Sequence, residues 1–234
     1  TDGTEGLLAR RKDIYCIRHP KNLGYGAALR TAFRFAVRQG YETLITIDCD
    51  GQHEPQRIPD FIAARTSEVD MVSGSRYLRE FPGDSPAPKD RRRINRILTG
   101  QINRLLGLRI TDAFCGFKAY RVAALAELRI TESGYAMPLE VWVQAARLGW
   151  NVVELPIPRI YLEEKRSFGG ALDNPCARLV VYQQVLQRSL TKYPARKQLL
   201  VSEKGASSGR QFLHPAHSGM EHITVSEKQG QVPC

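Results

Sequence analysis

Apolar and polar residues follow two kinds of pattern along the chain. Short runs of β-branched and apolar residues predict strands, and longer stretches with an apolar residue at every third or fourth position predict helices. Strands are expected at 14–17, 43–47, 69–73 and 151–155, with an edge or crossing strand at 116–120. Helices are expected at 27–39, 55–64, 92–106, 137–148 and 175–190. This alternation predicts an α/β fold, in which helices flank a mostly parallel sheet.

The same pattern divides the chain into two parts. Gly40 and Gly149 follow two of the expected helices, where glycine commonly ends a helix, and Pro175 stands at the first position of another. From Thr191 onward Ser, Gly, Lys and Gln dominate and the apolar periodicity disappears. We therefore expect one folded domain at 1–190 and a disordered C-terminal tail at 191–234.

Length and composition fit a protein with one sizeable core. The chain has 234 residues, of which 42% are hydrophobic and 25% charged. No apolar run approaches the ~20 residues that a membrane-spanning helix needs. The five cysteines are scattered and form no Cys-x-x-Cys, which argues against a zinc site and against a disulfide framework. We expect a cytoplasmic protein, either free or peripheral at the inner face of the membrane.

The formal net charge of +10 changes this picture by favouring an anionic partner. Nine basic residues against three acidic ones lie between Arg76 and Arg109. The stretch Arg91–Leu106 combines a basic face with an apolar one, which predicts a helix that lies against an anionic membrane surface. A solvated basic face is the alternative interpretation. Because few aromatic residues stand among the basic ones, no nucleic acid partner is expected.

The sequence Asp48-Cys-Asp50-Gly-Gln52 follows directly after an expected strand. Strand ends in open α/β sheets form the crevice in which ligands collect. Two carboxylates this close require a counter-charge, and Mg²⁺ or Mn²⁺ supplies one while leaving positions free for water and phosphate. An EF-hand loop is excluded, because a strand precedes and Pro59 occupies the twelfth position. A simple Asp-Gly turn, or two acids that cap the next helix, remain open alternatives.

Several segments in one order carry a resemblance to a known family. Together they resemble family 2 glycosyltransferases, in particular the dolichyl-phosphate mannosyltransferase-like branch, over roughly residues 1–190. The resemblance implies a GT-A-like fold. The segments are Asn22-Leu-Gly-Tyr-Gly-Ala-Ala-Leu-Arg30, Asp48-Cys-Asp-Gly-Gln-His-Glu-Pro55, Gly74-Ser-Arg-Tyr77, Asp112-Ala-Phe-Cys-Gly-Phe-Lys-Ala-Tyr120 and Arg166-Ser-Phe-Gly-Gly170.

The resemblance also implies roles for individual residues. Asp50 and Asp112 would be catalytic, with Asp112 acting as a general base or orienting the sugar. The metal ligands would be Asp48, Asp50 and Gln52. Lys118 stands where the family has an Arg, and Cys115 where it has a Ser, which we interpret as small packing. Donor- and phosphate-binding roles are implied for Asp2, Asp48, Gln52, Arg76, Lys118 and Arg166.

The first residues, Thr1-Asp-Gly-Thr4, resemble the end of the family's Asp-Asp-Gly-Ser-x-Asp-Gly-Thr sequence. The resemblance then implies a sheet whose N-terminal, nucleoside-binding strands are missing from this sequence. The function that it implies is metal-dependent transfer of a sugar, with inversion, from a nucleotide-sugar donor to an acceptor such as a polyprenyl phosphate. A glycan hydroxyl is the alternative acceptor. A non-catalytic module that binds anionic lipid or nucleic acid is the alternative of another class.

Overall fold

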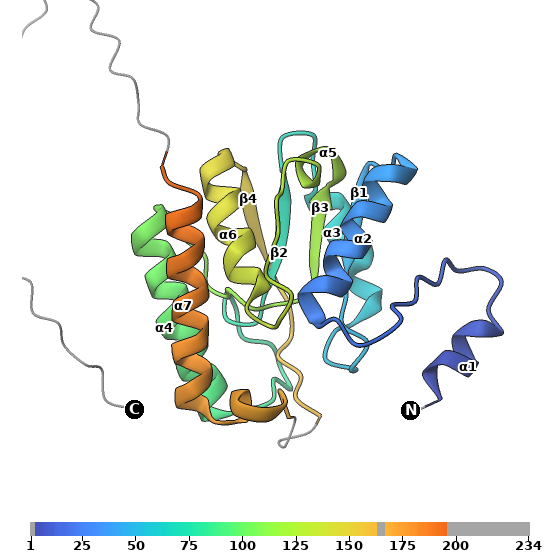
Figure 1. Cartoon of the computed structure of the whole chain (residues 1–234). Helices are drawn as coiled ribbons and strands as arrows, with labels where there is room; N and C mark the ends of the chain where they lie inside the picture. The colour runs from blue at the N-terminus through green and yellow to red at the C-terminus, as the bar shows by residue number, and fades with distance from the viewer. Residues whose placement is uncertain (1–2, 163–166, 196–234) are drawn as a thin grey trace, which may run out of the picture. The chain divides into compact units, whose positions relative to one another are not determined.

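A four-stranded mixed sheet forms the centre of the fold (Figure 1). The computed structural model describes residues 3–162 and 167–195, which lie in one compact unit. The strand order is β1-β3-β2-β4. These strands are β1 (Thr43–Thr46), β2 (Met71–Ser75), β3 (Lys118–Arg121) and β4 (Val152–Pro156).

Strand β3 runs against its neighbours. It pairs antiparallel with both β1 and β2, whereas β2 and β4 pair in parallel. The segment expected as an edge or crossing strand is therefore an interior strand of the sheet. The other three strands, β1, β2 and β4, all run in the same direction, as a mostly parallel sheet requires. The register places Thr46 opposite Lys118. As a result the loop before β3 lies at the same end of the sheet as the segments that follow β1 and β2, and this end holds the expected site.

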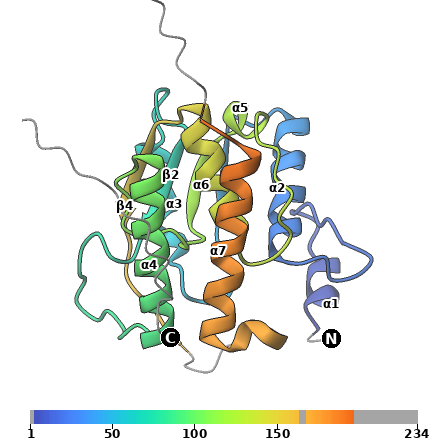
Figure 2. The ribbon, with the colours of Figure 1, turned by 60° about the vertical axis from the view of Figure 1, so that its left-hand side comes forward.

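Helices cover both faces of the sheet (Figures 1 and 2). Helix α3 packs on β1, β3 and β4, while α2 and α6 cover the opposite face with α4 and α7 packed beyond α6. Three of these helices end at left-handed glycines: Gly40 and Gly149, as the sequence predicts, and Gly107 after α4. The helices are α1 (Thr4–Ala9), α2 (Tyr25–Gln39), α3 (Ile58–Ala64), α4 (Lys89–Leu106), α5 (Val122–Leu125), α6 (Met137–Leu148) and α7 (Pro175–Lys192), with short 3₁₀ turns η1 (Pro55–Arg57) and η2 (Gly170–Asp173).

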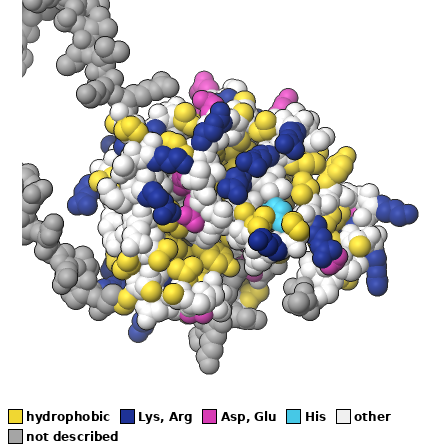
Figure 3. Space-filling view, in the orientation of Figure 1, with side chains coloured by type: hydrophobic (Ala, Val, Ile, Leu, Met, Phe, Trp, Pro, Cys, Tyr) yellow, Lys and Arg dark blue, Asp and Glu magenta, His cyan; other side chains and the backbone are white. Residues whose placement is uncertain are grey.

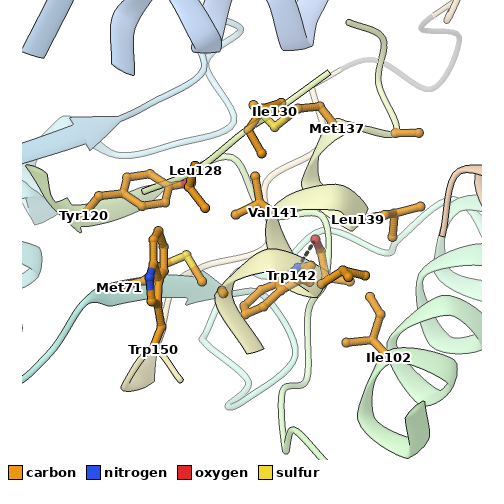
Figure 4. Close-up of a cluster of buried hydrophobic side chains, with 14 of the residues drawn as sticks. Met71, Ile102, Tyr120, Leu128, Ile130, Met137, Leu139, Val141, Trp142 and Trp150 are labelled. Atoms are coloured by element: carbon orange, nitrogen blue, oxygen red, sulfur yellow. Dashed lines mark hydrogen bonds between the residues drawn. The ribbon is translucent and has the colours of Figure 1, made fainter. Parts of the chain in front are cut away.

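The larger core lies between the sheet and α6, where Trp142 is fully buried (Figure 4). Its indole Nε1 donates a hydrogen bond to the Ala113 carbonyl at 2.9 Å. Met71 of β2 and Tyr120 of β3 enter the same cluster from the sheet. Because Ala113 follows Asp112, this bond fixes the segment that carries one of the expected site residues to the centre of the core.

Two expectations about the elements are wrong. Residues 14–17 form no strand: they pair with none of the four strands of the sheet, and Tyr15 and Ile17 are exposed to solvent. Helix α7 ends at Lys192, close to the expected end near 190, and the expected tail at 196–234 lies outside the described residues, so the boundary stays a prediction. The apolar side of α4 is not available to a membrane, since Ile94, Leu98 and Ile102 are buried in the core.

Within the described residues, no helix is both long enough and apolar enough to cross a membrane.

Candidate active site

A cavity of about 620 Å³ opens where the segments after β1 and β2 meet the first turns of α2, α4 and α7. Its lining contains a group of polar side chains and a group of aromatic ones. The polar group contains Asp48, Asp50, Gln52, His53 and Arg76, of which four were expected as site residues from the sequence. The cavity therefore brings together the motif that follows β1 and the motif that follows β2.

Local hydrogen bonds hold the backbone of Asp48 and the carboxylate of Asp50 after β1. The backbone N–H of Asp48 donates to His53 Nδ1 at 3.1 Å, and the backbone N–H of Gln52 donates to Asp50 Oδ1 at the same distance. Burial lowers the pKa of His53, although the nearby Asp48 charge acts in the opposite direction. The lowered pKa favours the neutral ring, which is the form whose Nδ1 can accept the hydrogen bond from Asp48. His53 thus orients the backbone of a candidate ligand, a role that the sequence did not suggest.

The polar group of the cavity lining fits a small divalent cation. Carboxylate and amide oxygens are the ligands that Mg²⁺ and Mn²⁺ prefer, and Asp48, Asp50 and Gln52 supply them at one place. In the part of the chain that the structure describes, no group of three or more His, Cys, Asp or Glu side chains has the geometry of a metal cage. A cation at Asp48 and Asp50 would therefore complete its coordination with the amide, with water and with ligand oxygens.

Arg76, which follows β2, forms a bidentate ion pair with the buried Asp112. Its Nε lies 2.7 Å from Oδ2 and its Nη2 lies 3.0 Å from Oδ1. Asn95 donates a further hydrogen bond to Asp112 at 2.7 Å. Burial alone would raise the pKa of Asp112, but the Arg76 charge and these hydrogen bonds hold it well below its usual range. Arg76 is consequently a fixed cation at the cavity wall, with its Nη1 directed at Tyr161 Oη at 3.4 Å.

Three aromatic rings in contact with one another also line the cavity, and we call Tyr25, Tyr135 and Phe168 the aromatic wall. Tyr25 stacks on Tyr135 with ring centroids 5.7 Å apart, and Tyr135 meets the edge of Phe168 at 5.5 Å. The glycines beside Tyr25 allow this contact. A Cβ at Gly24 would lie 2.3 Å from the Ser133 carbonyl oxygen, so the start of α2 approaches the loop before α6 only without side chains.

Two guanidinium groups border the aromatic wall. Arg178 lies over the Phe168 ring at 4.3 Å and Arg91 lies over it at 5.0 Å. Arg178 is almost completely buried and also pairs with Asp90. The cavity thus joins a carboxylate-lined part to an apolar part with positive charge at its border, an arrangement suited to two chemically different ligands.

Comparison with known proteins identifies the family of this chain. Residues 1–129 match the model of a family described as glycosyl transferase family 2. The chain belongs to this family. It is 30% identical over 177 residues to undecaprenyl-phosphate mannosyltransferase of Micrococcus luteus, covering 72% of this chain and 71% of that protein. It is also 30% identical over 168 residues to polyprenol monophosphomannose synthase of Mycolicibacterium smegmatis, covering 67% of this chain and 62% of the synthase.

A solved structure shares the GT-A-like fold of this family 2 glycosyl transferase. It is glucosyl-3-phosphoglycerate synthase from Mycobacterium tuberculosis, in complex with Mn²⁺, uridine diphosphate and glucosyl-3-phosphoglycerate. The TM-score is 0.50 at 14% identity, over 79% of this chain and 58% of the other. The chain described here therefore spans less than two thirds of the length of that enzyme and of the M. smegmatis synthase.

Two expected roles do not fit the positions of their residues in this family 2 chain. Asp112 is fully buried and paired with Arg76, which lowers its pKa, so it does not face the cavity as a general base would; its role in catalysis stays a prediction. Lys118 is buried inside the sheet rather than at the cavity, with its Nζ bonded to Ser73 Oγ and 4.8 Å from the Trp142 ring. Asp2 and Arg166 lie outside the described residues.

Other site residues were not recognised from the sequence. Asn95 looks like an ordinary polar position of an amphipathic helix, yet it is 4% exposed and holds Asp112. Tyr135 and Arg178 carry no motif that distinguishes them from surface residues. A signal was available only for Tyr25, which stands between the two glycines of the segment 22–30. Cys115, interpreted as packing, is indeed buried, and burial raises the pKa of its thiol to about 11.

Proposed function

We propose that this chain carries the metal-binding and acceptor-facing parts of an enzyme that transfers a sugar, with inversion, from a nucleotide-sugar donor to a polyprenyl phosphate. The observation that carries this proposal is the meeting of Asp48, Asp50 and Arg76 with the aromatic wall around one cavity. Two relatives are named for sugar transfer to undecaprenyl phosphate or to a polyprenol, which supports the class of acceptor.

The carboxylate-lined part is proposed to receive the diphosphate of the donor. Asp48, Asp50 and Gln52 would hold Mg²⁺ or Mn²⁺, which supplies positive charge against the departing diphosphate. The solved relative that contains Mn²⁺ and uridine diphosphate supports a divalent cation. Arg76 adds a second fixed positive charge at the wall, and Asp112 with Asn95 keeps its guanidinium in one orientation.

The aromatic wall is proposed to receive the acceptor. A polyprenyl phosphate has an apolar chain beside an anionic head, and the wall offers apolar ring faces beside Arg91 and Arg178. A phosphate oxygen is already charged, so attack on the sugar needs no strong base. The location of Asp112 beneath Arg76 is compatible with this acceptor, whereas a sugar hydroxyl would need a base that faces the cavity.

An anionic membrane surface is proposed as a further partner, through charge alone. Arg93, Arg96 and Arg104 are exposed along α4, although the apolar side of that helix is in the core. Figure 3 shows Lys and Arg side chains spread between apolar ones over one face of the molecule. Sedimentation with anionic vesicles that weakens with salt, and fails with neutral vesicles, is the expected result.

A transfer assay tests the proposal. The full chain is incubated with a radiolabelled nucleotide sugar, a polyprenyl phosphate and Mn²⁺, and label is counted in the organic phase. We expect label in the lipid, a loss of at least about a hundredfold in Asp50→Ala, and an inverted anomeric configuration in the product. Label in an added oligosaccharide instead would identify a glycan hydroxyl as the acceptor. Metal-independent binding of anionic vesicles without any transfer would favour the non-catalytic module.

A further inference from the structure

The loop before β3 lies directly against a candidate metal ligand. The register that sets Thr46 opposite Lys118, continued by two residues, brings Gly116 alongside Asp48 just beyond the last paired residues at this end of the sheet. Thr46 Oγ1 donates a hydrogen bond of 2.7 Å to the Gly116 carbonyl, which fixes the loop to the end of β1. Gly116 is buried, and its Cα faces the Asp48 carboxylate.

This approach leaves no room for a side chain at position 116. A Cβ there would lie 2.3 Å from Asp48 Oδ2, 2.8 Å from its Cγ and 2.9 Å from Oδ1. All three of the nearest atoms thus belong to one carboxylate. Gly116 is not among the described glycines with a positive φ, so the backbone conformation itself does not require glycine. The requirement comes from the Asp48 side chain.

We propose that Gly116 is a positioning residue for the metal site: its missing side chain creates the place in which the Asp48 carboxylate lies. Alanine at this position displaces the carboxylate, since a side-chain end moves more easily than the strand and loop around it. The backbone of Asp48 remains held by His53, so the displacement affects the carboxylate and not the fold. This inference rests on the metal site proposed above. It gives the segment Asp112–Tyr120 a role in that site, which is to leave space for the Asp48 carboxylate.

Metal binding by Gly116→Ala is the first test. Titration of the full-length chain with Mn²⁺, alone and with pyrophosphate, is followed by the electron paramagnetic resonance of free Mn²⁺. We expect an affinity at least about tenfold weaker than wild type, the usual effect of moving a group that orients a metal ligand. Gly100→Ala is the matched control, because a Cβ in that helix meets no atom within 4 Å. Wild-type affinity in Gly116→Ala would overturn the inference.

A thermal cycle tests the contact itself, independently of metal. Gly116→Ala should lower the melting temperature in the wild-type background by a few degrees. In an Asp48→Ala background the same change should leave it equal or higher, since the clash is gone and alanine restricts the unfolded chain. Equal losses in both backgrounds would contradict the proposed contact. If wild type binds no Mn²⁺, the proposed metal site is wrong, while the cycle still decides whether Gly116 positions Asp48.

Discussion

Arg76 binds both carboxylate oxygens of Asp112: its Nε lies 2.7 Å from Oδ2 and its Nη2 lies 3.0 Å from Oδ1. The Asp112 side chain is completely buried. Neither group can lose its partner without leaving a charge in a site with little water. The pair therefore contributes to the stability of the fold and also fixes the orientation of the Arg76 guanidinium at the cavity wall.

The first prediction concerns this pair. Asp112→Asn keeps the shape but leaves the Arg76 charge uncompensated, and should lower the free energy of unfolding by about 3–5 kcal/mol at pH 7. Arg76 depresses the folded-state pKa of Asp112, so the stability from the pair is present above the unfolded pKa of about 3.9 and is lost as the pH falls through the lower folded value. The gap between wild type and variant should therefore shrink below about pH 4.

Urea unfolding at pH 7, 5 and 3 measures this gap. The exposed pair of Asp13 with Arg11 gives the control, and Asp13→Asn should change stability little at any pH. A gap for Asp112→Asn that stays constant from pH 7 to pH 3 would show that lost charge is not its cause.

The second prediction concerns the metal. Mn²⁺ or Mg²⁺ should raise the melting temperature of the wild-type chain in the presence of a nucleoside diphosphate, and removal of the metal by chelation should reverse the rise. Asp50→Ala should abolish the rise, since a carboxylate of the proposed site is lost. Asp60→Ala, at an exposed position of α3, should retain it. The same rise in the Asp50 variant and in wild type would place the metal elsewhere.

The third prediction concerns the aromatic wall. Tyr135→Ala removes the ring between Tyr25 and Phe168, and should raise KM for a polyprenyl phosphate roughly tenfold, about 1.4 kcal/mol, with less effect on kcat. Steady-state kinetics with each substrate varied in turn measures this. The exposed Tyr15→Ala is the control. A rise in KM confined to the nucleotide sugar would assign the wall to the donor.

The fourth prediction separates Lys118 from phosphate binding. Met has a similar volume, so Lys118→Met should change the free energy of unfolding by less than about 1.5 kcal/mol and leave nucleoside diphosphate affinity unchanged. Denaturant unfolding and calorimetric titration measure the two quantities. A clear loss of diphosphate affinity in this variant would restore the phosphate-binding role that family resemblance implies.

Local patterns of apolar and polar residues were sufficient to predict most of the helices and strands. The periodicity at 27–39 and 137–148 predicts α2 and α6 closely, because burial of one helix face requires that spacing. The segment at 14–17 has the same apolar character as β1 but forms no strand. A strand needs a hydrogen-bonded neighbour, and the residues at 14–17 do not reveal whether they have one.

The sequence by itself determined the α/β class, the family, and the location of Asp48 and Asp50 directly after a strand. Which of the cavity residues bind substrate or metal stays a prediction. Only the tertiary structure decided that β3 is an interior antiparallel strand, that Asp112 lies beneath Arg76, and that Gly116 faces Asp48. The reason is that periodicity reports the surroundings of each residue along its own element. Contacts between residues far apart in the chain depend on strand order and register, which no local pattern contains.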